Sequence, residues 1–339
     1  MSNAPNAPVR LKDIARDLNV SVMTVSKVVR GCADVGAETR SRVLARVKEL
    51  NYQPNWVARS LAARRTFIIG LIVPDLMHSF FAEIAKGVSA AIRPLGYDVV
   101  ICNSEEDADV EASEIERLLG RQVDGLILAS CQPSAGADVF ERMESRNIPF
   151  VLIDRRFTEL QASYVGADDE AIGRMATGHL IDRGCRRIAH IAGQQRPTGI
   201  GRLTGYRDAL SAAGLPYDEA YVVEARDDAT GYDAMRRLLT LNPCPDGIFG
   251  YNDPTAAGAM KAILEAGLRI PHDIKVIGVG NVHYSDLLRV PLSTIDQSSD
   301  TIGQQAADIL LKAITSKRRR SSKSSIIIPP TLVARESTA

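Results

Sequence analysis

Residues 10–31, RLKDIARDLNVSVMTVSKVVRG, carry the pattern that decides the fold of the N-terminal part of the chain. Ser21 can begin a helix there by accepting a hydrogen bond from a free backbone amide. In residues 11–50, apolar residues recur at helical spacing in three successive short segments: Leu11, Ile14, Ala15 and Leu18; Val25, Val28 and Val29; Val43, Leu44, Val47 and Leu50. Two short helices with a tight connection, closed by a third, predict a helix-turn-helix unit.

The second of these helices is rich in valine and has only one charged residue, Lys27. Packing of its valines offsets their poor helix propensity, and small uncharged side chains on the other face allow the helix to enter a DNA major groove. Lys27 can donate to a guanine edge or to a phosphate. The side chains that we expect to contact the major groove or the phosphates are Ser21, Val22, Met23, Thr24, Ser26 and Lys27. The alternative is a plain three-helix bundle without a role in DNA binding.

The charge distribution supports a polyanionic partner. The 339-residue chain has a net charge of +0, yet residues 1–66 contain twelve Lys or Arg and five Asp or Glu. This basic N-terminal part is followed by a body of opposite net charge. Such an asymmetry predicts that the first 66 residues meet a polyanion, which agrees with the helix-turn-helix pattern in the same part of the chain.

Residues 51–66, NYQPNWVARSLAARRT, contain a short amphipathic segment that begins at Pro54. Isolated helices of this length are marginally stable in water, so we expect the segment to become helical only on DNA. Leu61 has no evident core to enter and can wedge into a minor-groove base step. Alternatively, Leu61 packs on the body as an ordinary linker residue.

From Thr66 onward, short apolar runs typical of strands alternate with helical segments, in two series at residues 66–160 and 161–290. This alternation predicts an α/β body with two lobes, each a parallel sheet flanked by helices. Ligands of such sheets bind at the carboxyl ends of the strands. We therefore expect a small-molecule cleft between the lobes.

The body lacks the motifs of common enzymes. No glycine-rich dinucleotide fingerprint, phosphate loop, nucleophilic serine elbow or His/Cys cluster occurs, so we expect neither an enzyme nor a bound cofactor or metal. The five cysteines are far apart and are expected to be reduced thiols. No apolar run is long enough to cross a membrane and the N-terminus does not resemble a secretory signal, which indicates the cytoplasm.

Polar or aromatic residues at strand ends and helix starts are candidates for the cleft. Asp154 and Asn252 follow apolar runs, whereas Phe80 and Arg202 begin helices. An aromatic face can stack on a ring-shaped ligand, and a guanidinium can donate to its oxygens. The alternatives are that Asp154 caps a turn and that Arg202 pairs with a nearby acid.

The head and the segment after it resemble the lactose-repressor (LacI) family of bacterial transcription regulators, and the similarity extends to the C-terminal PPTLVARES. The shared head pattern is present as Ala15, Val20-Ser21, Thr24-Val25-Ser26, Asn51-Tyr52 and Pro54-Asn55. Gly36 departs from the serine common at a helix cap, but glycine also serves there.

The resemblance implies a helix-turn-helix head over 1–52, a hinge over 53–66 and a periplasmic-binding-protein-like core over 67–339, with lobes at about 67–160 and 161–290 and crossovers near 290–339. It places Val22, Met23 and Lys27 in the major groove and implies hinge contacts in the minor groove by Asn55, Ala58 and Leu61. It also implies an effector pocket with Phe80, Asp154, Arg202 and Asn252, together with Arg196 and Thr198.

Two departures from the family concern this pocket. Gly280 takes the place of an effector-binding aspartate and is followed by Asn281, and Arg226 takes the place of an aromatic residue. The loss of a carboxylate and the gain of a guanidinium predict an anionic effector, such as a sugar acid or sugar phosphate. A neutral sugar is the alternative.

The expected function is a homodimeric, sequence-specific transcription regulator, a repressor whose affinity for a palindromic double-stranded operator changes with a small-molecule effector. The alternatives are a periplasmic-type solute-binding protein, an enzyme and a non-specific architectural DNA protein. The basic run Lys317–Arg320, with Lys323, is expected to be a solvated loop before the last strand.

Overall fold

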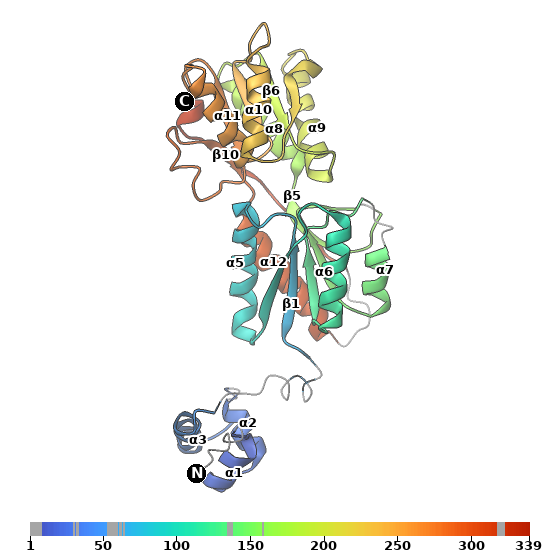
Figure 1. Ribbon diagram of the computed structural model, residues 1–339, viewed down its shortest axis with the longest axis vertical. Helices are drawn as coiled ribbons and strands as arrows, with labels where there is room; N and C mark the ends of the chain where they lie inside the picture. Colours follow the sequence, from blue (N-terminus) through green and yellow to red (C-terminus); the bar gives the residue numbers. More distant parts are fainter. Residues whose placement is uncertain are drawn as a thin grey trace, which may run out of the picture. The chain divides into compact units, whose positions relative to one another are not determined.

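The computed structural model describes residues 9–29, 31, 34–52, 60, 63, 65–133, 138–157, 159–316 and 323–339 of the chain. The chain divides into two compact units, Met1–Thr66 and Phe67–Ala339. Figure 1 shows an all-helical first unit and a second unit with two sheets, as the sequence predicts. None of the described helices has the length and apolarity that a membrane span requires.

The first unit contains α1 (Leu11–Leu18), α2 (Val22–Val29) and α3 (Ala37–Glu49). Asn19 ends α1 in the left-handed conformation, with a φ of 52°. Ser21 Oγ then accepts the backbone N–H of Thr24 at 3.0 Å, which confirms the expected start of α2. The three helices enclose one small core made of Ile14, Ala15, Val25, Val28 and Val43.

The first sheet of the second unit is wholly parallel and has the order β11-β5-β4-β3-β1-β2. Its strands are β1 (Ile68–Val73), β2 (Asp98–Asn103), β3 (Gly125–Leu128), β4 (Phe150–Ile153), β5 (Ser163–Ala167) and β11 (Ser325–Ile328). Its helices are α5 (Ser79–Ile92), α6 (Ala108–Gly120), α7 (Asp138–Ser145) and α12 (Ser299–Thr315). Two separate core clusters place α5 and α12 on one face and α6 and α7 on the other (Figure 1). We call this the first lobe.

The second lobe has the strand order β12-β10-β9-β8-β6-β7, parallel except for the β10–β12 pair. Its strands are β6 (Ile188–Ala192), β7 (Val222–Glu224), β8 (Gly247–Gly250), β9 (Lys275–Val279), β10 (Ser293–Asp296) and β12 (Thr331–Val333). Its helices are α8 (Asp169–Asp182), α9 (Pro197–Ala212), α10 (Asp228–Leu238) and α11 (Asp253–Glu265). The pair α8 and α9 covers one face and the pair α10 and α11 the other. Short 3-10 turns occur at Arg93–Leu95, Glu219–Tyr221 and Glu336–Thr338.

The chain passes between the lobes three times: from β5 to α8, from β10 to α12, and from β11 to β12. The lobe boundary therefore differs from the one expected near residue 160, because Ser163–Ala167 pairs with β4 of the first sheet. The sequence shows the order of strands along the chain but not the sheet that each strand joins. Residues 299–328 likewise return to the first lobe, where β11 pairs with β5.

Candidate functional site

The exposed face of α2 presents the side chains expected to contact DNA. Val22 is 47% exposed and Met23 is 61% exposed, whereas Val25 and Val28 are buried in the core of the first unit. Lys27 lies beside this face, and its Nζ pairs with Asp34 Oδ2 at 2.5 Å. Exposed apolar side chains beside a cation suit a groove that offers methyl groups and acceptors.

Several expected contacts fall outside the residues that the structure describes. These are the hinge residues Asn55, Ala58 and Leu61. The basic run Lys317–Arg320, which we expect to be a solvated loop, also lies outside the described residues. The expected minor-groove wedge therefore stays a prediction.

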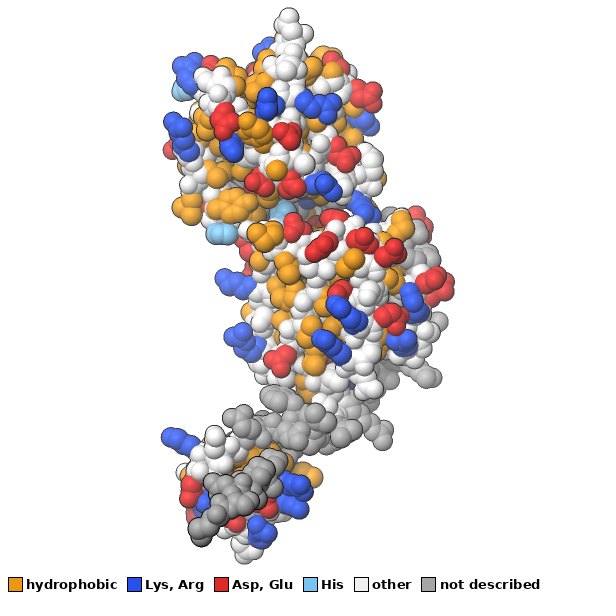
Figure 2. All heavy atoms as spheres, viewed as in Figure 1, with side chains coloured by type: hydrophobic (Ala, Val, Ile, Leu, Met, Phe, Trp, Pro, Cys, Tyr) orange, Lys and Arg blue, Asp and Glu red, His pale blue; other side chains and the backbone are white. Residues whose placement is uncertain are grey.

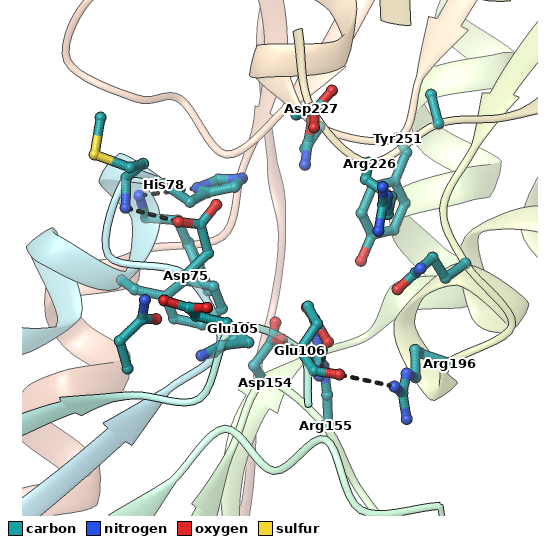
Figure 3. Close-up of a pocket in the computed structure, with 18 of the residues that line it drawn as sticks. Asp75, His78, Glu105, Glu106, Asp154, Arg155, Arg196, Arg226, Asp227 and Tyr251 are labelled. Atoms are coloured by element: carbon teal, nitrogen blue, oxygen red, sulfur yellow. Dashed lines mark hydrogen bonds and ion pairs between the residues drawn. The ribbon is translucent and has the colours of Figure 1, made fainter. Parts of the chain in front are cut away.

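A cavity of about 450 Å³ lies between the two lobes of the second unit (Figure 3). Its walls come from the segments that follow the carboxyl ends of the parallel strands in both sheets, where the sequence places the ligand site. The lining residues are Pro74, Asp75, Met77, His78, Phe80, Phe81, Asn103, Glu105, Glu106, Asp154, Arg155, Gln194, Arg196, Arg202, Ala225, Arg226, Asp227, Tyr251, Asn252 and Gln297. The size matches pockets for small metabolites.

Aromatic rings form the apolar part of the cavity wall. Phe80 and Phe81 are 3% and 6% exposed at the start of α5, with their ring centroids 5.1 Å apart. Tyr251 lies on the second lobe, and Thr198 Oγ1 and the Tyr251 hydroxyl are 2.7 Å apart, within hydrogen-bond distance. Ring faces on both lobes can cover the apolar side of a sugar or a base.

Three acidic lining residues have a left-handed backbone. Glu105, Glu106 and Asp154 have φ values of 53°, 59° and 61°. Non-glycine residues seldom adopt this conformation, and strained backbone of this kind clusters at functional sites. Asp154 follows β4 directly, and burial raises the pKa of its carboxyl, opposed by the nearby Arg155.

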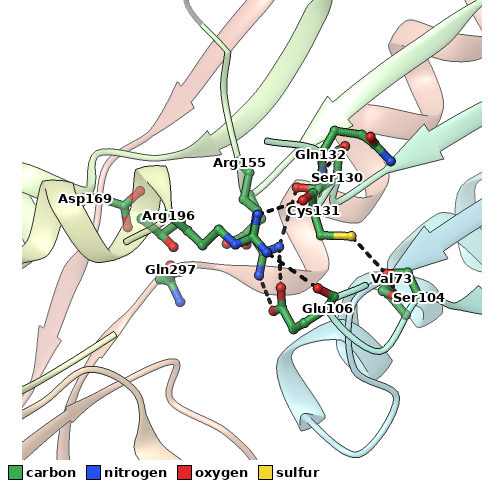
Figure 4. Close-up of polar contacts among 12 residues, drawn as sticks. Val73, Ser104, Glu106, Ser130, Cys131, Gln132, Arg155, Asp169, Arg196 and Gln297 are labelled. Carbon is green, nitrogen blue, oxygen red and sulfur yellow. Dashed lines mark hydrogen bonds and ion pairs between the residues drawn. The ribbon is translucent and has the colours of Figure 1, made fainter. Parts of the chain in front are cut away.

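Hydrogen bonds join the lobes at one edge of the cavity, next to an ion pair within the first lobe (Figure 4). Arg155 is 5% exposed and donates through both terminal nitrogens to the carboxylate of Glu106. Arg196 occupies the N-cap position of α9 in the second lobe, and its Nη1 donates to the carbonyl oxygen of Cys131 in the first lobe at 2.7 Å. A second, longer bond runs from Arg196 Nη2 to the carbonyl oxygen of Glu106 at 3.5 Å.

The cavity contains both signs of charge. Its lining has the carboxylates of Asp75, Glu105, Glu106, Asp154 and Asp227 and the guanidiniums of Arg155, Arg196, Arg202 and Arg226. Figure 2 shows acidic side chains on both sides of the hollow between the lobes. Arg155, Arg196 and Arg202 already donate to protein acceptors. The side chain of Arg226 has no hydrogen bond or ion pair to another described residue and is exposed.

The structure brings six of the expected effector residues to this lining: Phe80, Asp154, Arg196, Arg202, Arg226 and Asn252. Asn252 is also the N-cap of α11, because its Oδ1 accepts the backbone N–H of Thr255. Thr198 and Asn281 are not part of the lining. Thr198 contacts Tyr251, whereas Asn281 donates to Asp296 at 3.1 Å and accepts from Arg335 at 2.7 Å.

Other lining residues were not expected from the sequence. Arg155 directly follows Asp154, and Glu105 and Glu106 follow the apolar run of β2, so the strand-end pattern points to all three. Gln297 carries no such signal, because it lies at the crossing from β10 to α12. Within the described residues, no group of three or more His, Cys, Asp or Glu side chains could hold a metal ion.

Comparison with known proteins finds a separate family model for each of the two units. A family model described as bacterial regulatory proteins, lacI family, matches residues 10–55. A second model, described as periplasmic binding proteins and sugar binding domain of LacI family, matches residues 66–336.

Individual relatives match most or nearly all of the chain. The ribose operon repressor of Halalkalibacterium halodurans is 35% identical over 333 residues, which cover 97% of this chain and 96% of the repressor. The lac repressor dimer bound to operator and the anti-inducer ONPF has a TM-score of 0.82 at 28% identity, covering 98% of this chain and 99% of that one. A LacI family regulator from Enterococcus faecium with bound ribose has a TM-score of 0.72 at 27% identity. The match covers 80% of this chain and 98% of that regulator.

Proposed function

Because this chain belongs to the LacI family of bacterial regulatory proteins, we propose that it represses transcription by binding a near-palindromic operator as a dimer, under the control of a sugar-type effector. It is a DNA-binding transcription regulator and not an enzyme. The observation that carries the proposal is the cavity at the carboxyl ends of both sheets, in a chain that also has an exposed, groove-compatible α2.

Operator binding rests on the first unit. Val22 and Met23 contact thymine methyl groups, and Lys27 donates to a base edge or a phosphate after it leaves Asp34. An exposed ion pair contributes little stability, so this exchange costs little. A two-fold dimer requires a site with two related half-sites, and the basic head makes binding strongly salt dependent.

The effector is a small polyhydroxylated molecule. Asp154 and Glu105 accept hydrogen bonds from ligand hydroxyls, while Phe80 and Tyr251 cover the ring. The relatives named for ribose or holding ribose point to the same class of ligand.

The charges of the lining bear on the anionic effector that the sequence suggests. The lining has five carboxylates and four guanidiniums, and Arg196 and Arg202 already have acceptors. We therefore place a neutral sugar first and an anionic sugar derivative second. Arg226 is the observation that favours the second candidate, because its guanidinium is available to a carboxylate or phosphate.

In the proposed mechanism, effector binding changes the angle between the lobes, and residues 53–66 transmit this change to the head. Such coupling is reciprocal and typically amounts to about 1–3 kcal/mol. The regulator acts in the cytoplasm, where its DNA is.

Two measurements test the proposal. Selection from a pool of random duplexes is expected to enrich a near-palindromic sequence. Calorimetry with D-ribose, D-ribose 5-phosphate and D-ribonate, along with hexose counterparts, is expected to detect one neutral sugar. Tight binding of only the acids or phosphates would establish the anionic alternative. Absence of any enriched duplex would contradict the regulator itself.

A further inference from the structure

The guanidinium of Arg202 is bonded to three segments that lie far apart in the sequence. Its Nε donates to Asp169 Oδ1 at 2.9 Å, and its Nη1 donates to the carbonyl oxygen of Tyr251 at 2.7 Å. Its Nη2 donates to Gln297 Oε1 at 2.8 Å. Arg202 is 3% exposed and Gln297 is 5% exposed, so these are bonds of a buried cation.

Two of these partners lie where the chain passes between the lobes. Asp169 is the first residue of α8, directly after the crossing from β5. Gln297 lies between β10 and α12, at the second crossing. One side chain of α9 therefore joins two of the three connections between the lobes.

We propose that Asp169 and Gln297 are positioning residues, which hold Arg202 against the cavity and through it tie the first two lobe crossings together. Arg202 Cζ lies 4.6 Å from the ring centroid of Tyr251, so the same guanidinium is part of the cavity wall. One consequence is that an effector touching Arg202 acts directly on both crossings, and this consequence rests on the proposed function. The link between the two crossings through Arg202 does not depend on the proposed function.

The close packing of α8 on α9 builds this arrangement. A Cβ at Gly201 would lie 2.7 Å from Asp169 Cβ, and a Cβ at Gly173 would lie 2.2 Å from the carbonyl oxygen of Arg202. Glycine at both positions allows the helices to approach until Asp169 reaches Arg202 Nε. The two glycines thus provide the space between α8 and α9, and Asp169 and Arg202 provide the charges.

Arginine suits this role better than lysine. Its planar guanidinium has five N–H donors in fixed directions and can serve three acceptors on different segments. A buried cation that loses an acceptor loses its compensation for desolvation. Removal of one partner is therefore expected to disturb the other two contacts.

This shared dependence distinguishes a tie between the crossings from three local contacts. A side chain that only stabilises its own segment affects amides near itself. A side chain that acts through Arg202 also affects the other crossing. The positioning role therefore predicts an effect at a distance along the chain.

Hydrogen exchange of the full-length protein, read in segments 168–176 and 299–306, measures this effect. Replacing Gln297 by methionine (Gln297→Met) keeps the size of the side chain and removes the acceptor. We expect exchange to rise about tenfold in both segments. Gln297→Glu retains an acceptor oxygen, so it is expected to restore protection in both.

Arg174→Gln is the matched control. Arg174 of α8 also joins α8 to α9, through Asp208, but it does so on the surface. The Arg174→Gln variant is expected to leave hydrogen exchange in segment 299–306 unchanged. If Gln297→Met does not fold, the milder variant Asp169→Asn takes its place. For this variant the proposal predicts faster hydrogen exchange in segment 299–306, at the other crossing.

The proposal is overturned if Gln297→Met raises exchange only in 299–306, or if Asp169→Asn raises it only in 168–176. It is also overturned if Gln297→Glu exchanges as fast as Gln297→Met. The readout uses neither DNA nor sugar. A failure here is therefore distinguishable from a failure of the proposed function.

Discussion

Arg196 of the second lobe donates a hydrogen bond across the cavity edge to the main-chain carbonyl oxygen of Cys131 in the first lobe, at 2.7 Å. The acceptor is a backbone atom, so the contact depends on how the lobes are oriented and not on the side chain at residue 131. Cys131 N in turn donates to the buried carboxylate of Glu111, which holds this backbone in place. Arg196 is thus a direct link between the two lobes beside the proposed effector site.

Arg196→Met is expected to weaken effector binding about tenfold, because hydrogen bonds from a charged donor are worth about 1.5–3 kcal/mol. The measurement is calorimetry with the sugar that the wild type binds. Arg207→Met, in the same helix, removes an exposed arginine that contacts Tyr217 outside the cavity, and it serves as the control. Equal affinity of the Arg196→Met variant and the wild type would show that the link does not contribute.

The pair Lys27–Asp34 gives opposite expectations for its two members. Lys27→Ala removes a donor to the operator and is expected to raise the operator Kd about tenfold. Asp34→Asn removes the negative charge that pairs with Lys27 in competition with DNA, so it should leave the Kd unchanged or lower it. Fluorescence anisotropy with the selected duplex measures both. A loss of affinity in Asp34→Asn as large as in Lys27→Ala would contradict the assigned role of Lys27.

Two glycines of α8 differ in what surrounds them. A Cβ at Gly173 would meet the carbonyl oxygen of Arg202 at 2.2 Å, whereas a Cβ at Gly178 would meet nothing within 4 Å. Gly173→Ala is therefore expected to lower the free energy of unfolding by about 1–3 kcal/mol. Gly178→Ala is expected to raise it by about 0.4–1 kcal/mol, because alanine restricts the unfolded chain. Urea unfolding tests both, and equal effects would contradict the close α8–α9 contact.

His78 introduces a pH dependence of stability. Its Nδ1 accepts the backbone N–H of Phe80 at the start of α5, and burial lowers the pKa of His78 to about 4. The native state then binds fewer protons than the unfolded chain between pH values of about 4 and 6.5. The stability that neutral His78 contributes is present above about pH 6.5 and is lost as the pH falls towards 4.

His78→Asn keeps an N-cap acceptor but does not titrate. The free energy of unfolding of the wild type, minus that of this variant, is expected to fall by at least about 1 kcal/mol between pH values of about 7 and 4.5. Urea titrations at both pH values measure the difference. A difference that does not change with pH would show that His78 stays equally protonated in both states.

The parts of this fold that follow local rules were predictable. Val25 and Val28 mark the buried face of α2, and Ser21 marks its start. Asp154 follows an apolar run, so the rule for carboxyl ends of parallel strands places it in the cavity. These inferences need only periodicity and the direction of the strands.

The remaining features depend on contacts between distant segments. Gln297 reaches the cavity because the chain crosses between the lobes there, and Glu106 becomes a partner of Arg155 only when two strand ends meet. Asn281 was expected in the cavity because it follows Gly280, which takes the place of the family's effector-binding aspartate. The structure instead places its amide between Asp296 and Arg335. No periodicity in the sequence encodes these pairings.

The central claim is that one chain binds a specific duplex and changes its affinity for that duplex when a small molecule enters the cavity. The direct measurement is the anisotropy of the selected duplex, titrated with full-length protein with and without the sugar found by calorimetry. The account predicts a shift in Kd of about fivefold or more, corresponding to about 1–3 kcal/mol of coupling. Identical binding curves, at a sugar concentration that saturates the cavity, would contradict it.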